Sequence, residues 1–587
     1  MTITSSERVF QGISHVKGDA SGKLIASDLE LSFWGGVNPN TSEIIDRHHP
    51  LSGQYLQDNI LAIPGGRGSC TGSSVMLELL LKDKGPKAMI FERQEDILVL
   101  GVIVAEEIFA KTIPVVMLDP KDFHEILQFN GSDIYISNDQ VSVSPHIRTS
   151  DTSSLVRSST KVELSCIDRA LLSGEYGDAS RAAMNIVLRM AGLLGVSELM
   201  DITQVHVDGC GYTGPGCLLF AESLRDRGGK VRVPTSLNSI SIDKNLLQVQ
   251  GASPEFAAAA GRLADAYIDM GARSTFTCAP YQLDSAPKFG DQVAWAESNA
   301  VVYANSVLGA RTMKYPDFLD ICIALTGRAP KGGPHIQINR MASIIVNVEG
   351  LENVTIDDSF YPLLGYHVGS LAPSQIPVIV GIQSQFPSKD DLKALGAAFA
   401  TVSSAPMFHI LGVTPEAVDL GAVIAKDVDL RSVRVEVRDL IGCWDELNSA
   451  SKDQPVGLVS LGNPHFSLDE IQILNSLCRG RHKNPDIAIM VTCSRATYNS
   501  AYMAGLLDEL QGFGVQFVTD TCWCMITNPT IPRSKSAIMT NSGKYAHYGP
   551  GLTGKSFYFG DLARCVGAAC GDRDIESRPQ WLEKSGQ

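Results

Sequence analysis

The sequence lacks the features of a membrane-spanning, secreted or nucleic-acid-binding protein. It has no run of about 18 apolar residues, so it predicts no membrane-spanning helix. Its start, MTITSSERVF, has neither the basic nor the apolar region of a secretory signal, and we expect a cytoplasmic location. The formal net charge of −15 argues against nucleic acid and anionic membranes as partners.

The cysteines lack the number and spacing of a disulfide framework or a zinc knuckle. There are 13, an odd number, scattered over the chain, and no C-x-x-C pair occurs. In a reducing compartment we expect most of them to be small buried residues, with a minority available as metal ligands.

Length and composition indicate a well-packed protein of several domains. The chain has 587 residues, of which 44% are hydrophobic and 19% charged, which predicts two to four domains. The stretch HIRTSDTSSLVRSST, which follows Pro145, is rich in Ser and Thr and has no periodicity. We therefore place a boundary near 147–160 and expect a small domain over 1–150 and a large one over 151–587.

A glycine-rich turn stands out in PGGRGSCTGSSVMLELLL, which begins at Pro64. Gly72 is followed by Ser73 and Ser74 rather than by the lysine of a phosphate-binding loop. Ser69 directly follows Gly68, so the spacing of a nucleophile elbow is absent as well. What remains is a turn that enters a helix over 75–82, whose first amides favour an anion, or a tight loop without chemistry.

Strand and helix patterns alternate along the chain. Strands are expected at 87–92, 112–118, 133–137 and 141–145, with a helix at 99–111 and a helical region over 163–195. Seven later strand-like runs each end in polar residues. They are 202–208, 230–238, 274–278, 456–465, 487–495, 515–522 and 536–545. Because ligands of open α/β sheets bind beyond the carboxyl ends of strands, these ends predict a site assembled from distant segments.

Residues with suitable chemistry lie at these ends and near other predicted turns. Cys278 and Cys522 each end an apolar run before a turn, where a thiolate is favoured. His335 and His465 are candidate acids or ligands. Four arginines near predicted turns are candidates for a bidentate carboxylate contact: Arg311, Arg328, Arg340 and Arg495.

Longer motifs carry a resemblance to the aconitase X family. The turn GGRGSCTGS is similar to the signature of the family's small domain. TCAPYQL, AWAESNAVVYANSVLGART, GNPHFSLDEI, DTCW and TNSGKYAHYGPG resemble motifs of its large domain. The likeness spans residues 8–575 in the order of the fused single-chain members. It implies an aconitase-like α/β fold, with a small swivelling α/β domain followed by a larger multi-layer α/β region.

The resemblance also implies roles for single residues. It identifies Ser69 as an alkoxide base and iron as the Lewis acid that takes the leaving hydroxyl. Its implied substrate-binding residues are Gly68, Cys70, Thr71, Ser298, Asn299, Arg311, His465, Arg495 and Lys544. Its implied metal-site residues are Cys278, Asn463 and Cys522.

Asn463 departs from the family pattern, in which a third cysteine is expected. An amide is a much poorer ligand of iron–sulfur clusters than a thiolate. We therefore expect a two-iron cluster or a mononuclear iron rather than an intact four-iron cluster. Recruitment of Cys524 as a ligand is a further alternative.

The implied activity is elimination of water from a small hydroxylated carboxylic acid. The fused order resembles members that convert cis-3-hydroxy-L-proline to Δ1-pyrroline-2-carboxylate. Dehydration of a phosphorylated mevalonate, and a binding protein that has lost its cluster, are the alternatives. The expected partner is a small-molecule hydroxy acid, and the expected state is a monomer or a small homo-oligomer.

Overall fold

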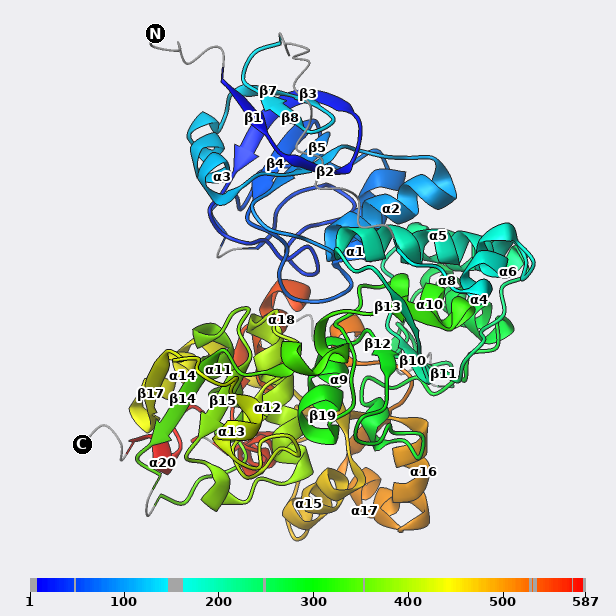
Figure 1. Cartoon of the computed structure of the whole chain (residues 1–587). Coiled ribbons are helices and arrows are strands. Elements are labelled where there is room, and N and C mark those ends of the chain that lie inside the picture. Colours follow the sequence, from blue (N-terminus) through cyan, green and yellow to red (C-terminus); the bar gives the residue numbers. More distant parts are fainter. Residues whose placement is uncertain are drawn as a thin grey trace. The chain divides into compact units, whose positions relative to one another are not determined.

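The computed structural model describes residues 8–46, 49–145, 162–245, 250–351, 354–526, 530–531, 536–572 and 574–583. They divide into two compact units (Figure 1). The first comprises the described residues up to Thr235 together with Asp269–Gly271 and Tyr315–Gly332. The second comprises the described parts of Ser236–Ile268, Ala272–Lys314 and Gly333–Gln587. The boundary region predicted at 147–160 lies wholly outside the described residues, as does its Ser/Thr-rich stretch.

An eight-stranded mixed sheet dominates the start of the first unit, in the order β1-β8-β7-β3-β4-β5-β6-β2. Its strands are β1 (Val9–Gln11), β2 (Ile13–Val16), β3 (Asp19–Ala26), β4 (Asn59–Ile63), β5 (Ala88–Phe91), β6 (Val115–Met117), β7 (Asp133–Ser137) and β8 (Gln140–Ser142). Strands β3 to β6 pair in parallel, and the others pair antiparallel. The parallel strands β4 and β5 are buried over nearly their whole length, which explains their continuous apolar runs, whereas β3 is buried only in its last three residues.

Helices complete the first unit. They are α1 (Gly72–Leu81), α2 (Ile97–Phe109), α3 (Pro120–Ile126), α4 (Cys166–Ser173), α5 (Asp178–Leu193), α6 (Pro215–Asp226) and α10 (Leu319–Thr326), with the short strands β9 (Leu199–Asp201), β10 (Gln204–Val207) and β13 (Arg328–Pro330). Helix α1 packs against α2 and α6, and α5 packs against α2 and α10. The helical region predicted over 163–195 is two helices, because Gly174 and Gly177 between them adopt φ values of 86° and 91°.

The second unit contains two parallel sheets. One has the order β20-β19-β18-β21-β22, with β18 (Val456–Phe466), β19 (Ala488–Cys493), β20 (Val515–Val518), β21 (Ala537–Thr540) and β22 (Phe557–Phe559). The other has the order β16-β15-β14-β17, with β14 (Ile344–Glu349), β15 (Pro377–Val380), β16 (His409–Ile410) and β17 (Ser432–Glu436). In the five-stranded sheet the chain proceeds from β18 to one edge and then returns to pair β21 with β18. The strand order therefore reverses between β18 and β21, the place where open α/β sheets bind ligands.

Helices and short segments surround these sheets. They are α9 (Ser298–Tyr303), α11 (Phe360–Leu371), α12 (Lys389–Val402), α13 (Leu420–Val423), α14 (Ile441–Leu447), α15 (Leu468–Cys478), α16 (Arg495–Met503), α17 (Leu506–Phe513), α18 (Gly543–Thr553), α19 (Leu562–Cys570) and α20 (Gln580–Glu583), with β12 (Val293–Trp295). Helix α8 (Pro254–Asp269) and strand β11 (Thr235–Leu237) lie mostly in this unit as well. Figure 1 shows α11, α12 and α14 beside β14, β15 and β17, where Phe360, Phe399 and Trp444 form part of one buried core.

Two of the seven predicted strand runs differ from the structure. The prediction of a strand at 274–278 was wrong: the segment is an irregular loop in which Phe276 has a φ of 42° and the Thr277 amide donates to Leu237 O at 3.2 Å. The run 230–238 forms a strand only after Pro234, which has no amide hydrogen for a sheet.

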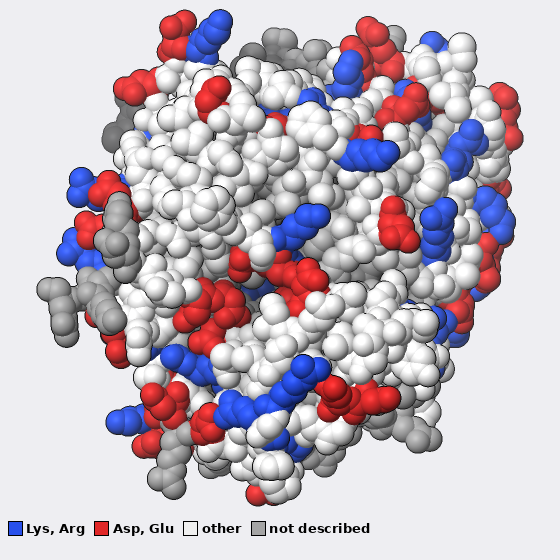
Figure 2. Space-filling view, turned by 90° about the horizontal axis from the view of Figure 1, so that it is seen from below, with Lys and Arg blue, Asp and Glu red and all other residues white. Residues whose placement is uncertain are grey.

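Charged side chains of both signs lie interspersed on the face shown in Figure 2. Within the described ranges, no helix combines the length and the apolar character needed to cross a bilayer.

Close packing of α11 on α12 predicts a glycine requirement at position 365. A Cβ at Gly365 would lie 2.2 Å from Leu395 O, so the helices would have to separate. We expect Gly365→Ala to lower the free energy of unfolding by about 1–3 kcal/mol, as overpacking does. Gly442→Ala is the control, because a Cβ there, on α14, meets no atom within 4 Å. Equal denaturation midpoints for the two variants would contradict this packing.

Candidate functional site

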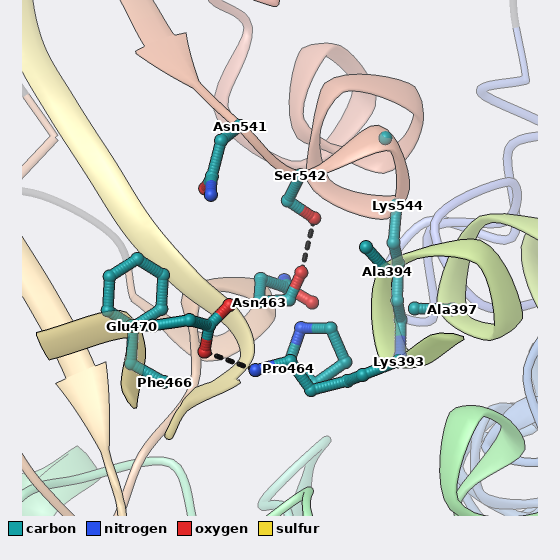
Figure 3. A pocket seen from close by; sticks show the side chains of 11 residues that line it. Lys393, Ala394, Ala397, Asn463, Pro464, Phe466, Glu470, Asn541, Ser542 and Lys544 are labelled. Atoms are coloured by element: carbon teal, nitrogen blue, oxygen red, sulfur yellow. Dashed lines mark hydrogen bonds and ion pairs between the residues drawn. The ribbon is translucent and has the colours of Figure 1, made fainter. Parts of the chain in front are cut away.

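A pocket lies where the strand order of the five-stranded sheet reverses (Figure 3). Its walls come from the end of β18, the start of α18, and α12 and α15. The lining residues include Asn463, Pro464, Asn541, Ser542, Gly543, Lys544, Lys393 and Glu470. The Ser542 hydroxyl donates to Asn463 O, which joins the ends of β18 and β21 across the reversal. The polar residues at the ends of the predicted strand runs 456–465 and 536–545 therefore meet at this pocket.

His465, also at the end of β18, is fully buried and connects three segments. Its Nε2 lies 2.8 Å from Thr521 O, its Nδ1 lies 3.1 Å from Thr277 Oγ1, and its amide donates to Cys278 Sγ at 3.3 Å. Burial lowers the pKa of His465 to about 4, so the ring is neutral at pH 7. Because a carbonyl only accepts, Nε2 carries the proton, and Nδ1 accepts from Thr277. The protein itself therefore uses both nitrogens of this predicted substrate-binding residue.

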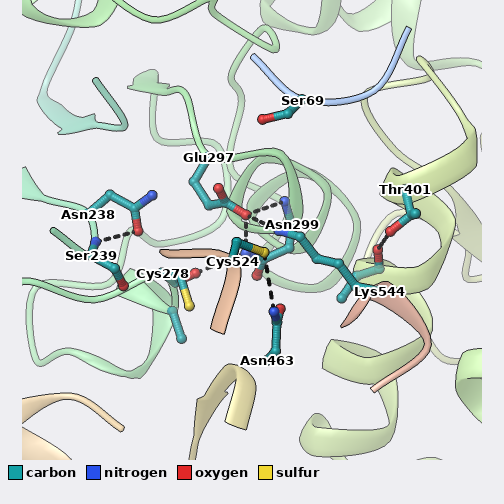
Figure 4. Close-up of polar contacts among 12 residues, drawn as sticks. Ser69, Asn238, Ser239, Cys278, Glu297, Asn299, Thr401, Asn463, Cys524 and Lys544 are labelled. Atoms are coloured by element: carbon teal, nitrogen blue, oxygen red, sulfur yellow. Dashed lines mark hydrogen bonds and ion pairs between the residues drawn. The ribbon is translucent and has the colours of Figure 1, made fainter. Parts of the chain in front are cut away.

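Three cysteines of the second unit interact with one another. Burial raises the pKa of Cys278 to about 12. A hydrogen bond between the Cys522 and Cys524 thiols raises the pKa of Cys522 and lowers that of Cys524. The Asn463 amide donates to Cys524 Sγ at 3.4 Å and lowers the pKa of Cys524 further (Figure 4). The charge of the Lys544 ammonium has the same effect. Cys524 is thus the most readily ionised of the three, although we expected it only as an alternative ligand.

The three cysteines offer sulfur donors, which suit iron or an iron–sulfur cluster rather than a hard cation. In the part of the chain that the structure describes, no three His, Cys, Asp or Glu side chains converge as a metal-binding group. Asn463, the predicted third position, directs its amide at Cys524.

A buried ion pair lies beside the thiols. Lys544 Nζ is 2.7 Å from Glu297 Oε1, and the two side chains are 12% and 9% exposed. Burial would raise the pKa of Glu297 and lower that of Lys544. Their mutual attraction reverses both effects, so the pKa of Glu297 is lowered and that of Lys544 is raised well above its usual value.

Asn299 joins this pair to Cys278. Its Nδ2 donates to Glu297 Oε1 at 2.5 Å and to Cys278 O at 3.0 Å, while Tyr281 OH donates to its Oδ1 at 2.8 Å. Ser298, the neighbouring predicted residue, is buried as the first residue of α9. Glu297 and Tyr281 were not predicted as site residues. Glu297 nevertheless lies in the motif AWAESNAVVYANSVLGART, directly before the predicted Ser298.

The four arginines that were considered for carboxylate recognition mostly bind the protein's own acids. Arg328 binds Asp168 at 2.8 Å, Arg340 binds Glu416 at 2.5 Å, and Arg495 binds both oxygens of Asp520 at 2.5 and 2.6 Å. Arg311 donates to His335 O at 3.2 Å and to Gln337. Arg328 and Arg495 thus make the predicted bidentate contact, but with aspartates of the protein itself.

In the first unit, Ser69 lies in the glycine-rich turn three residues before α1 begins. Its hydroxyl is 3.1 Å from Thr71 Oγ1, and the Thr71 amide donates to Ser69 Oγ at 3.3 Å. Gly68 has a φ of 85°, which a residue with a side chain rarely adopts. The Cys70 side chain is fully buried, whereas Ser69 is half-buried.

The sequence matches known proteins over nearly its whole length. The chain fits models of the aconitase X swivel domain (residues 9–144) and the first (161–338), second (342–445) and third (456–571) aconitase X domains. It is 61% identical to a cis-3-hydroxy-L-proline dehydratase of Hypocrea jecorina, over 96% of this chain and 95% of that protein. It is 49% identical to a protein of the same name from Pseudomonas aeruginosa, over 97% and 98%.

A solved structure gives the same result for the fold. The holo-form of aconitase X from Thermococcus kodakaraensis aligns with a TM-score of 0.61 and 29% identity. The alignment covers 71% of this chain and all of that one.

The buried ion pair predicts an asymmetric response to substitution. Glu297→Gln leaves the Lys544 ammonium buried without a counter-charge, and we expect a loss of about 3–5 kcal/mol in the free energy of unfolding. Glu297→Gln combined with Lys544→Met removes both charges and is expected to recover most of that loss. An additive loss in the double variant would refute the pairing.

The same pair predicts a pH dependence. The pKa of Glu297 is lowered from 4.5 and that of Lys544 is raised from 10.5. The stabilisation is therefore present from about pH 5 to 10, and is lost when acid protonates Glu297 or base deprotonates Lys544. Denaturation curves of wild type and double variant at neutral pH, below pH 4.5 and above pH 10.5 check it.

Proposed function

Because the chain belongs to the aconitase X family, we propose that it is a hydro-lyase that converts cis-3-hydroxy-L-proline to Δ1-pyrroline-2-carboxylate. The observation that carries the proposal is 61% and 49% identity, over nearly the whole chain, to two proteins that bear the name of this activity. The likeness includes both the turn with Ser69 and the segments with the cysteines.

In the proposed reaction, Ser69 removes the proton from C2 of the substrate, and the hydroxyl leaves C3 as water. The resulting enamine tautomerises to the cyclic imine, so the ring loses one water overall. The amide of Thr71 already donates to Ser69 Oγ, and the hydroxyl of Thr71 can rotate to donate as well. Both donors stabilise an alkoxide, which supports Ser69 as the base.

The proposed cofactor is iron or a two-iron cluster held by Cys278 and Cys522, with Cys524 in place of the missing third cysteine. Bound iron would supply a Lewis acid for the departing hydroxyl. The lowered pKa of Cys524 and the neighbouring Lys544 ammonium support a thiolate there. Asn463 donates to that sulfur, so its role in the proposal is to orient a ligand.

The base assignment predicts the effect of removing one hydroxyl. Ser69→Ala is expected to fold normally and to lower kcat for dehydration by about 10²–10⁴-fold, as loss of a general base does. Ser173→Ala, the same change on α4 in the same unit, is the control and should retain activity. The measurement is the rate of imine formation. Turnover of Ser69→Ala near that of wild type would refute the assignment.

The ligand assignment predicts changes in metal content. Cys278→Ser and Cys522→Ser are each expected to lose iron and visible absorption, because a thiolate ligand is removed. Asn463→Cys is expected to retain more iron and sulfide than wild type. Iron, acid-labile sulfide and absorption of anaerobically purified protein are measured together. Unchanged content in both serine variants would show that the metal lies elsewhere.

A further inference from the structure

The turn that carries Ser69 is held by a distant residue of the same unit, Asp317. The Asp317 amide lies 3.4 Å from Cys70 O. Ser73 Oγ lies 3.0 Å from Cys70 O and 3.1 Å from Asp317 O, so its one proton can serve either carbonyl. Ser74 Oγ donates to Asp317 Oδ2 at 3.0 Å. Amide, carbonyl and carboxylate of one residue thus all face the start of α1.

These contacts are shielded from water. Asp317 and Ser74 are each 1% exposed, and Ser73 and Cys70 are fully buried. A buried hydroxyl or carboxylate that loses its partner has no solvent to replace it. The contacts therefore restrain the turn more strongly than equivalent surface contacts would.

The carboxylate of Asp317, which precedes α10, accepts from Ser74 of α1. The N-cap of α10 is Phe318, which makes no side-chain capping bond. Asp320 instead accepts from the amides of Asp208 and Ile321, at 2.7 and 2.6 Å. Asp317 lies one residue before this N-cap, and its carboxylate is directed at α1.

The backbone beside Asp317 is strained. Phe318 has a φ of 83°, a conformation that an aromatic residue rarely adopts. Its fully buried ring packs against Phe220 of α6, with centroids 4.5 Å apart. Such strain persists only where the surroundings enforce it, and it clusters at functional sites. Here it accompanies the orientation of Asp317 toward the turn.

We propose that Asp317 is a positioning residue for Ser69, which fixes the turn through Cys70, Ser73 and Ser74. This role rests on the proposed function of Ser69, and it assigns Asp317 no contact with substrate. Displacing a catalytic group by about 1 Å can cost about 10²-fold in rate. Loss of the restraint should therefore lower kcat while leaving KM nearly unchanged.

The test compares four variants: Asp317→Ala, Asp317→Asn, Ser74→Ala and Thr326→Ala. Asp317→Ala and Ser74→Ala each break the carboxylate contact, whereas Asp317→Asn keeps an acceptor oxygen. Thr326→Ala removes a buried hydroxyl from the other end of α10, where it is 2.8 Å from Cys322 O, and controls for general destabilisation. Each is measured for kcat and KM with cis-3-hydroxy-L-proline and for amide hydrogen exchange in peptides covering Cys70–Val75.

We expect Asp317→Ala and Ser74→Ala to lower kcat about 10–100-fold, with KM changed less than about threefold. The amides of Gly72 and Ser73 should exchange at least about tenfold faster. Asp317→Asn should stay close to wild type in both readings, and Thr326→Ala should leave the turn peptides unchanged. If Asp317→Ala does not fold, Ser74→Ala, which removes a single oxygen, decides by the same two readings.

The two readings separate the possible failures. If wild type does not turn over hydroxyproline, the proposed function fails, and hydrogen exchange alone decides whether Asp317 fixes the turn. Wild-type exchange of the turn in Asp317→Ala or Ser74→Ala would overturn the positioning role. A kcat loss no larger than that of Thr326→Ala would overturn it as well.

Discussion

Buried polar groups must find partners inside the protein, and in the second unit this constraint centres on His465. Its neutral ring joins Thr277 to Thr521, and its amide reaches the sulfur of Cys278. The segments that carry Cys278 and Cys522 are thereby held at the end of β18. Loss of the ring would leave the Thr521 carbonyl and the Thr277 hydroxyl without this buried partner, beside the segments that carry the thiols.

The sequence predicted much of this arrangement because the relevant signals are local. Apolar runs marked β18, β19, β20 and β21, and the polar residues after them lie at the carboxyl edge of the sheet. Strand order cannot be read from such runs, so the reversal between β18 and β21 appears only in the structure. That reversal explains why Asn463 and Ser542, 79 positions apart, are in contact.

Other features could not be predicted because they depend on contacts between distant segments. The run 274–278 has the composition of a strand, but its backbone is bent at Phe276 and bonds to Leu237 of β11 through the single Thr277 amide. The arginines were interpreted as ligands for a substrate carboxylate, and nothing local reveals that Asp168, Glu416 and Asp520 occupy them. Asp317 likewise carries no signal in its own neighbourhood, because its partners lie some 240 positions earlier.

If this chain eliminates water from cis-3-hydroxy-L-proline, proton NMR can follow the reaction directly. That compound and phosphorylated mevalonate are each incubated with anaerobically purified protein. We expect the signals of the hydroxyproline ring to disappear and those of Δ1-pyrroline-2-carboxylate to grow, with phosphorylated mevalonate unchanged. Dehydration of phosphorylated mevalonate alone, or binding of hydroxyproline without any new signal, would contradict this expectation.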